Sequence, residues 1–209
     1  MSEAERGIRT TVAVIDSSTS GIAQSPLHDA LQQAGEVSVV ACTSQRDDVI
    51  DLMWQSVPDA IVVGVDEPGF DAIALCQELS DALPVCRVLL VSEDGDAPFA
   101  AMVAGAAAVV SRATLTAVPG VIVQQVARGE AILSQGWAGE ALHAFELDGA
   151  PHLTATEREV LQRLAKGTSS EVIAGLHEVP ARLVRLHAAY ALAKLQRAER
   201  DRRLGTEPT

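Results

Sequence analysis

Short apolar runs alternate with stretches of helical periodicity along the first 130 residues. The runs cover residues 11–15, 37–42, 60–65, 87–92 and 107–110, and their content of Val, Ile and Leu predicts five β-strands. Helices are predicted at residues 22–34, 46–55, 72–83, 97–104 and 118–128, most of them closed by Gly or Pro. This alternation indicates an α/β domain, a doubly wound five-stranded parallel sheet, because each crossover helix must bury its apolar stripe on the sheet.

The C-terminal part has helical periods and no strand pattern. Helices are predicted at residues 155–166, 169–176 and 180 to about 200. Gly167 stands where a helix end needs a left-handed residue, and Ser169 is a typical N-cap. The break at residues 177–179 has the length of the turn in a helix-turn-helix. We predict an α/β domain at residues 8–130, a connector at 131–152 that begins helical and becomes irregular, a small all-α helix-turn-helix domain at 153–200 and a loose tail at 201–209.

Charge divides the chain near the same boundary. Residues 1–150 hold six Arg, no Lys and 21 acidic residues, a net charge of −15, whereas residues 151–209 have a net charge of +3. Because an acidic body repels nucleic acid, any nucleic-acid contact is expected in the C-terminal part. No apolar run reaches the ~18 residues of a membrane span, and we expect no secretory signal. Cys42, Cys76 and Cys86 are widely spaced and odd in number, which is typical of reduced thiols and favours a cytoplasmic location.

Chemistry in a doubly wound domain sits where a parallel strand ends and its loop begins. The third predicted strand ends around Gly64, which has no side chain to offer. The sequence contains no nucleophile–base pair and no phosphate-cradling loop, so we predict that the chain is not an enzyme. The five histidines have no ligand-like spacing with Cys or acidic residues, and we therefore expect neither a metal site nor a cofactor.

Several motifs follow one another in a specific order along nearly the whole chain. The first group is VAVID, PDAIVV followed four residues later by PG, RVLLVS, GAAAVVSR and ARGEAILS. The second group is LTATEREVLQRLAKGTSSEVIA and, after a turn, RLVRLHAAYALAKL. Together they resemble two-component response regulators of the NarL/FixJ type, in which a receiver domain precedes a LuxR-type helix-turn-helix. The resemblance implies a flavodoxin-like strand order and a role in transcription.

The resemblance also implies where a receiver would carry its phosphorylation site. Receivers hold Mg²⁺ with two adjacent acids after the first strand, where this chain has Asp16 and Ser17. The phosphoacceptor position falls on Gly64, the phosphoryl-sensing hydroxyl on Ser92, and the lysine after the fifth strand on Arg112. One Asp beside a Ser is a poor anchor for Mg²⁺, and a glycine has no nucleophilic oxygen. We predict a vestigial site in a pseudo-receiver, meaning a receiver-like domain that is not phosphorylated.

Two details of this site bear on that prediction. Asp66 is the alternative acceptor, but a shift of two residues, roughly 6 Å along a strand, misaligns it with Asp16. For Asp16 itself we favour a solvated acid at the end of a strand over a metal ligand. The aromatic residue that receivers reorient on the fifth strand falls near Val109 or Val110, which are aliphatic, so this switch is expected to be absent as well.

The last predicted helix contains the candidate DNA contacts. The resemblance places Arg185 at the family's basic contact position, with Arg182 next and Ala189 where a second polar contact often lies. Lys194 and Arg197 are the candidate phosphate contacts. The alternative is that Arg182 and Arg185 are a pair of solvated helix charges. Four apolar residues at helical spacing are expected to face the interior of the domain: Val184, Ala188, Leu192 and Leu195.

Two functions of different classes follow. The leading hypothesis is a DNA-binding transcriptional regulator with a phosphorylation-independent pseudo-receiver. The alternative is a protein-interaction module that has lost DNA binding and dimerises with or sequesters a partner regulator. It is motivated by the few basic residues on the DNA-facing side of the last predicted helix and by the family's dimer-forming last helix, which has no clear apolar counterpart after Gln196. A receiver-mediated small-ligand sensor is compatible with both. The expected partners are DNA, a small molecule, and a second copy or a partner regulator. This last partner is expected to form a homodimer or mixed dimer through the receiver, by its fourth helix and fifth strand, or through the connector; no membrane is expected.

Overall fold

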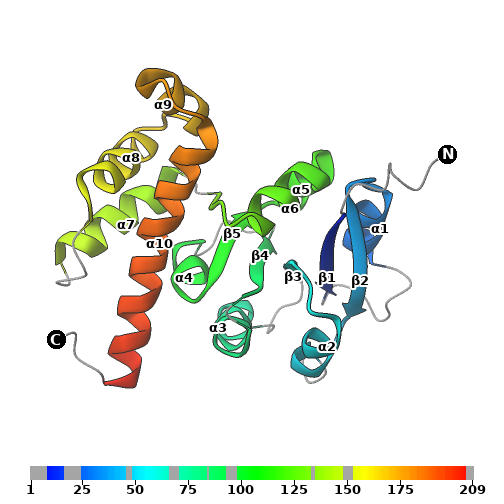
Figure 1. Ribbon diagram of the computed structural model, residues 1–209. Helices are drawn as coiled ribbons and strands as arrows, with labels where there is room; N and C mark the ends of the chain where they lie inside the picture. Colours follow the sequence, from blue (N-terminus) through cyan, green and yellow to red (C-terminus); the bar gives the residue numbers. More distant parts are fainter. Residues whose placement is uncertain are drawn as a thin grey trace.

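The computed structural model describes residues 9–16, 25–45, 49–65, 71–83, 85–92, 98–132, 135–147 and 153–205. Ser17 and Asp66, both named as candidate site residues, lie outside the described residues. A sheet with helices on both faces occupies one side of the molecule, and a group of four helices lies beyond one edge of this sheet (Figure 1).

Five parallel strands form the sheet, as the apolar runs predict. They are β1 (Thr10–Asp16), β2 (Val37–Thr43), β3 (Ala60–Val65), β4 (Arg87–Ser92) and β5 (Ala106–Val110). Their order is β2-β1-β3-β4-β5, and neighbouring strands pair in parallel. The doubly wound, flavodoxin-like receiver fold is therefore confirmed.

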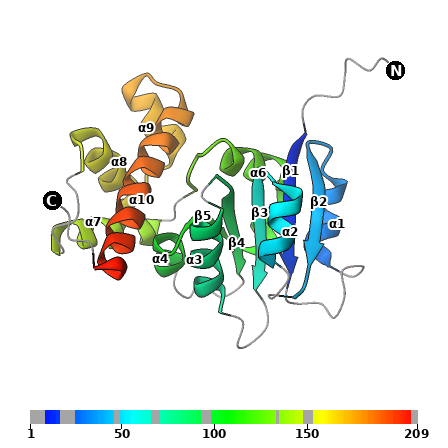
Figure 2. The same cartoon turned by 60° about the horizontal axis from the view of Figure 1, so that its bottom comes forward.

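Helices cover both faces of the sheet (Figure 2). One face packs against α1 (Pro26–Gln33), α5 (Arg112–Ala117) and α6 (Pro119–Ala127), and the other against α2 (Val49–Ser56), α3 (Ala72–Ala82) and α4 (Pro98–Val103). Side chains of a strand alternate between the two faces, so Val12 and Val14 of β1 join one apolar cluster while Ala13 and Ile15 join the other. α5 is absent from the helices predicted from the sequence, because its six residues are too few to show an apolar period.

The C-terminal helices include the predicted helix-turn-helix. They are α8 (Ala155–Ala165), α9 (Ser170–His177) and α10 (Ala181–Leu204), close to the predicted ranges. Gly167 has a φ of 82°, and the Ser169 hydroxyl accepts a hydrogen bond from the Val172 N–H, so both predicted helix signals have their expected roles. Between α9 and α10 the chain turns at Glu178, which adopts a left-handed conformation.

The helical start that the sequence predicts for the connector is present, and the predicted loose tail is more helical than expected. Within the predicted connector, residues 135–147 form α7 (Gln135–Leu147), whose buried Trp137, Ala138 and Ala141 join the apolar cluster that includes α8. The predicted loose tail begins at residue 201, but α10 continues to Leu204 and ends at Gly205, which has a φ of 66°. No helix in the described residues combines the length and apolar character needed to cross a membrane.

α10 lies along the β5 edge of the sheet and contacts α4 (Figures 1 and 2). The Gln196 side-chain amide donates to the carbonyl oxygens of Met102 and Ala106, at 2.6 and 3.2 Å. Further along the helix, Arg200 pairs with Asp81 of α3 at 3.0 Å. The surface of α4 and β5, considered above for dimerisation, is therefore in contact with α10 in this structure.

Candidate functional site

The carboxyl ends of the strands bring together the residues of the predicted vestigial site. Asp16 at the end of β1 pairs in register with Gly64 of β3, and Gly64 pairs on its other side with Val91 of β4. Ser92 ends β4, and Arg112 begins α5 just after β5. The parallel topology thus gathers Asp16, Gly64, Ser92 and Arg112 at the carboxyl ends of the strands, where the resemblance places them.

Asp16 is buried, with 1% of its surface exposed, so its interpretation as a solvated acid is wrong. Its Oδ2 accepts a 2.6 Å hydrogen bond from the hydroxyl of Ser25, the N-cap of α1. Its Oδ1 lies 3.8 Å from Nη2 of Arg112. A buried carboxylate needs such partners, because its removal from water costs several kcal/mol otherwise. The Asp16 carboxylate therefore forms part of an internal ion-pair network.

The space above Gly64 is filled. A Cβ built on Gly64 would overlap the Cδ1 atom of Leu27 and lie 3.1 Å from Oδ1 of Asp16. Leu27 belongs to α1 and is fully buried. An acidic side chain at position 64 would therefore need both neighbours to move, and in a close-packed interior such movement is costly.

The described residues do not fit the Mg²⁺ site of a receiver. Mg²⁺ requires a near-octahedral shell of oxygens anchored by carboxylates. Here the Asp16 carboxylate is engaged by Ser25 and Arg112, and Gly64 supplies no side-chain oxygen. In the parts of the chain that the structure describes, no group of three or more His, Cys, Asp and Glu side chains is placed to hold a metal ion.

Ser25 and Leu27 are site residues that sequence reasoning missed. Leu27 fits the apolar period of its helix, but periodicity does not indicate which strand residue a side chain covers. The pair Ser25-Pro26 was the available signal, because Ser at the N-cap and Pro at the first helical position mark a helix start. This signal places Ser25 at the start of α1, where its hydroxyl donates to Asp16 at the end of β1.

The two candidate arginines of the helix-turn-helix differ in how far they are exposed to solvent. The side chain of Arg182, in the first turn of α10, is 60% exposed, whereas that of Arg185 is 17% exposed. Arg185 Nε donates to Oε2 of Glu130 at 2.6 Å, and its Nη1 donates to Oε1 of Glu171 at 2.9 Å. Arg182 Nε lies 3.7 Å from the other oxygen of Glu130. Glu130, which follows α6 in the receiver-like part, is itself only 2% exposed, so Arg185 connects the two parts of the molecule.

Lys194 and Ala189 also contact protein in this structure. Lys194 Nζ donates to Oε2 of Glu157 at 2.6 Å. Glu157 forms a capping box with Thr154 at the start of α8. Burial opposes ionisation of Glu157, but the hydrogen bonds from Lys194 and Thr154 outweigh it and lower its pKa. Ala189 is partly buried against the apolar cluster of α10.

Glu130 and Glu157 were not among the residues singled out from the sequence. Each pairs with a cation far along the chain, Glu130 with Arg185 over 55 residues and Glu157 with Lys194 over 37. No local pattern in the sequence indicates such pairs.

The chain is similar in sequence to known transcriptional regulators and in fold to a response regulator. No family model matches the chain. It is 26% identical to the transcriptional regulatory protein LiaR of Bacillus subtilis, over 81% of this chain and 84% of LiaR. It is 29% identical to YxjL of the same organism, an uncharacterized transcriptional regulatory protein, over 73% of this chain and 75% of YxjL. In fold, it resembles the response regulator RcsB in a complex with DNA, with a TM-score of 0.52 and 16% identity over 90% of this chain and 92% of that one. The sequence relatives and the fold both agree with the resemblance: the chain is similar to transcriptional regulators of the NarL/LuxR type, and it has the fold of response regulators in which a receiver domain precedes a helical C-terminal domain.

Proposed function

We propose that this chain regulates transcription by binding DNA through α9 and α10, and that its receiver-like part is a pseudo-receiver that acts without phosphorylation. One observation carries the second half of this proposal: the space above Gly64, where a receiver has its acceptor carboxylate, is filled by Leu27 and Asp16. The first half is supported by relatives that are transcriptional regulators and by the helix-turn-helix itself.

Phosphoryl transfer needs a nucleophilic oxygen in line with the leaving group. Gly64 offers no such oxygen, and the adjacent Asp16 carboxylate already accepts a hydrogen bond from Ser25 and pairs with Arg112. Asp66 is the alternative acceptor. The proposal predicts that neither position accepts a phosphoryl group.

Incubation of the full chain with acetyl phosphate and Mg²⁺, followed by intact-mass measurement, tests this half of the proposal. We expect no added phosphoryl group, and none in Gly64→Asp either, because Ser17 and Arg112 remain in place of the family's acid and lysine. A phosphorylated wild-type species would overturn the proposal. Its loss in Asp66→Asn would then identify Asp66 as the acceptor.

DNA binding by Arg185 requires that its contacts to Glu130 and Glu171 be exchanged for contacts to DNA. The arrangement described here is then a closed one. Glu130→Gln weakens the interdomain ion pair without removing the side chain, and we expect it to raise the affinity for DNA several-fold. Arg185→Ala in the Glu130→Gln background should lower the affinity again, because a cation that faces the DNA is lost.

Fluorescence anisotropy with promoter DNA of the chain's own operon measures these affinities at several salt concentrations. Each lost phosphate contact should reduce the slope of log K against log salt by about 0.9. Arg9→Ala is the matched control, since Arg9 is an exposed arginine of the receiver-like part. Absence of salt-sensitive binding in both wild type and Glu130→Gln would refute DNA binding.

A second candidate function is a protein-interaction module without DNA binding. The observation that favours it is that Arg185 and Lys194 are both engaged by carboxylates of the chain itself. Under this alternative, the chain would leave DNA unbound but would change the DNA binding of a partner regulator through a mixed dimer. Size-exclusion chromatography with light scattering tests the dimer, for which the receiver-like part is the proposed surface.

A cytoplasmic location belongs to the leading proposal. All three cysteines are free thiols, and burial raises the pKa of Cys76 to about 12, which makes it a weak nucleophile. Free, unreactive thiols are typical of proteins in a reducing compartment.

A further inference from the structure

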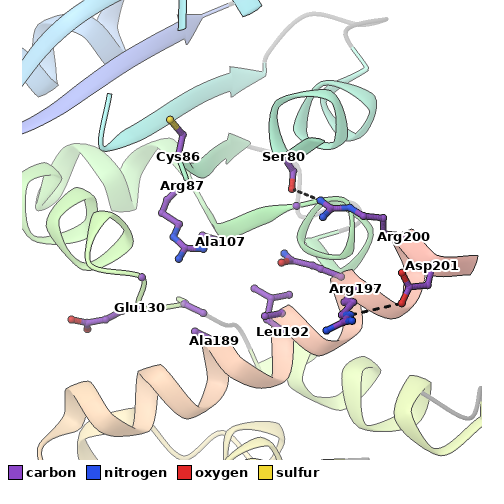
Figure 3. Close-up of a pocket in the computed structure, with 15 residues that line it drawn as sticks. Ser80, Cys86, Arg87, Ala107, Glu130, Ala189, Leu192, Arg197, Arg200 and Asp201 are labelled. Carbon is purple, nitrogen blue, oxygen red and sulfur yellow. Dashed lines mark hydrogen bonds and ion pairs between the residues drawn. The ribbon is translucent and has the colours of Figure 1, made fainter. Parts of the chain in front are cut away.

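A cavity of about 380 Å³ lies between the receiver-like part and α10 (Figure 3). One wall is formed by the end of α3, by the starts of β4 and β5, and by the turn after α6. The opposite wall is formed by α10 from Ala189 to Asp201. The cavity therefore lies at the amino ends of the strands, away from Asp16 and Gly64 at their carboxyl ends.

Arginines from both walls line this cavity. Arg87, the first residue of β4, extends toward α10, while Arg197 and Arg200 come from α10 (Figure 3). The Arg87 guanidinium rests beside Gly129, where a Cβ would lie 3.6 Å from its Nη2 atom. Gly129 has a φ of 80°, a left-handed conformation in which this turn favours glycine.

The carboxylates of the cavity do not balance these arginines. The two acidic lining residues are Glu130 and Asp201, and Glu130 already binds Arg185 at 2.6 Å. Arg197 lies 3.9 Å from Asp201, at the long end of an ion pair. Among the described residues, no ion pair involves Arg87. Arg200 pairs with Asp81 of α3 at 3.0 Å, so the local excess of positive charge comes from Arg87, in a chain whose net charge is −12.

We propose that this cavity binds a small polyanion that carries phosphate or carboxylate groups, held by Arg87 on one side and by Arg197 and Arg200 on the other. Guanidinium groups bind such anions through paired, charge-assisted hydrogen bonds. The volume lies within the range of about 300–1,000 Å³ that is common for small-molecule sites. Because the arginines come from both parts of the molecule, the bound anion joins the receiver-like part to α10.

This inference goes beyond the proposed function and does not depend on it, because the anion contacts neither Gly64 nor DNA. The bound anion also affects how firmly α10 is held against the receiver-like part. An anion between Arg87 and α10 stabilises the closed arrangement, in which Arg185 binds Glu130. Ligand binding should therefore raise the melting temperature of the full chain.

Isothermal titration of the full chain with pyrophosphate and with citrate, at constant ionic strength and without DNA, tests the site. We expect saturable binding of at least one probe and a rise in melting temperature with the same probe. The probe that binds more tightly identifies phosphate or carboxylate as the preferred group. Arg87→Ala should weaken binding at least tenfold, whereas Arg158→Ala, which removes an exposed arginine of α8 outside the cavity, should leave it unchanged.

Arg87→Ala is the decisive variant, because Arg200→Ala would also remove the ion pair with Asp81. Circular dichroism of Arg87→Ala should match the wild type and thereby confirm that it is folded. Absence of saturable binding for both probes overturns the proposal. Equal affinity of wild type and folded Arg87→Ala overturns it too.

Discussion

Replacement of Gly64 by Ala tests whether Leu27 fills the place of a phosphoacceptor. The added Cβ would overlap Cδ1 of Leu27 and lie 3.1 Å from Oδ1 of Asp16. Leu27 is fully buried and Asp16 is 1% exposed, so neither can swing into solvent without exposing buried groups. The new methyl group must therefore displace the end of Leu27 within the apolar cluster that it shares with Leu31 and Val62.

The expected energies follow from this overlap. Overpacking of a core typically costs about 1–3 kcal/mol, and replacement of Gly by Ala regains roughly 0.4–1 kcal/mol through the unfolded chain. Gly64→Ala should therefore lower the free energy of unfolding by between about 0 and 2.6 kcal/mol. Leu27→Ala deletes a buried leucine and should cost about 2–5 kcal/mol. In the double variant the new methyl group occupies space left by Leu27, so the combined loss should be about 1 kcal/mol smaller than the sum of the single losses.

Urea denaturation of the four proteins, followed by circular dichroism, gives this coupling energy. Gly139→Ala in α7 is the matched control, because a Cβ there meets nothing within 4 Å. It should raise the free energy of unfolding by about 0.5–1 kcal/mol, and its effect should add to that of Leu27→Ala. A cycle of Gly64→Ala and Leu27→Ala that is additive within about 0.5 kcal/mol would refute a filled site. So would a Gly64→Ala protein more stable than the wild type.

Three further predictions concern the ion pairs and the capping box. Arg185→Ala leaves the buried Glu130 without its closest cation and should lower the free energy of unfolding by about 3 kcal/mol in urea denaturation; an unchanged midpoint would contradict this. Thr154→Ala removes the hydroxyl of the capping box and should cost about 1 kcal/mol in the same assay, with Thr154→Ser closer to wild type. Because the folded-state pKa of Glu157 lies below its ordinary value of 4.5, its contribution to stability should be complete above that pH and lost as the pH falls through the lowered value. Lys194→Met should flatten the pH dependence of the urea midpoint in this acid range.

The strands could be predicted closely because buried parallel strands are apolar along their whole length. The observed β3 and β4 have the predicted bounds at both ends. For α7 the sequence predicts that the connector begins helical but gives no bounds, although Trp137, Ala138 and Ala141 form an apolar stripe at helical spacing. Two glycines in its first turns, Gly136 and Gly139, lower the helix propensity of the segment, and packing against α8 compensates for them.

For the candidate site, the sequence predicts which residues meet but not what surrounds them. Parallel topology alone brings Asp16, Gly64 and Arg112 together at the carboxyl ends of the strands. The burial of Asp16 depends on Ser25, whose position is set by how α1 packs on the sheet. In the same way, helical spacing places Arg185 on the polar side of α10, but its partner Glu130 is brought there only by the docking of α10 on the β5 edge.

The carboxyl ends of the strands and the β5 edge of the sheet differ in their contact with α10. This difference limits how any signal can reach the helix-turn-helix. The carboxyl end of β3 is filled by Leu27 and bordered by the Asp16–Arg112 pair, and Gly64 provides no oxygen that could be modified. α10 instead contacts the receiver-like part at the β5 edge, where Gln196 donates to two backbone carbonyl oxygens. This edge gives a stimulus that does not phosphorylate the chain a direct route to α10, because the two parts are in contact there. A ligand or protein partner that binds there changes the stability of the docked α10 directly, without any rearrangement at Gly64.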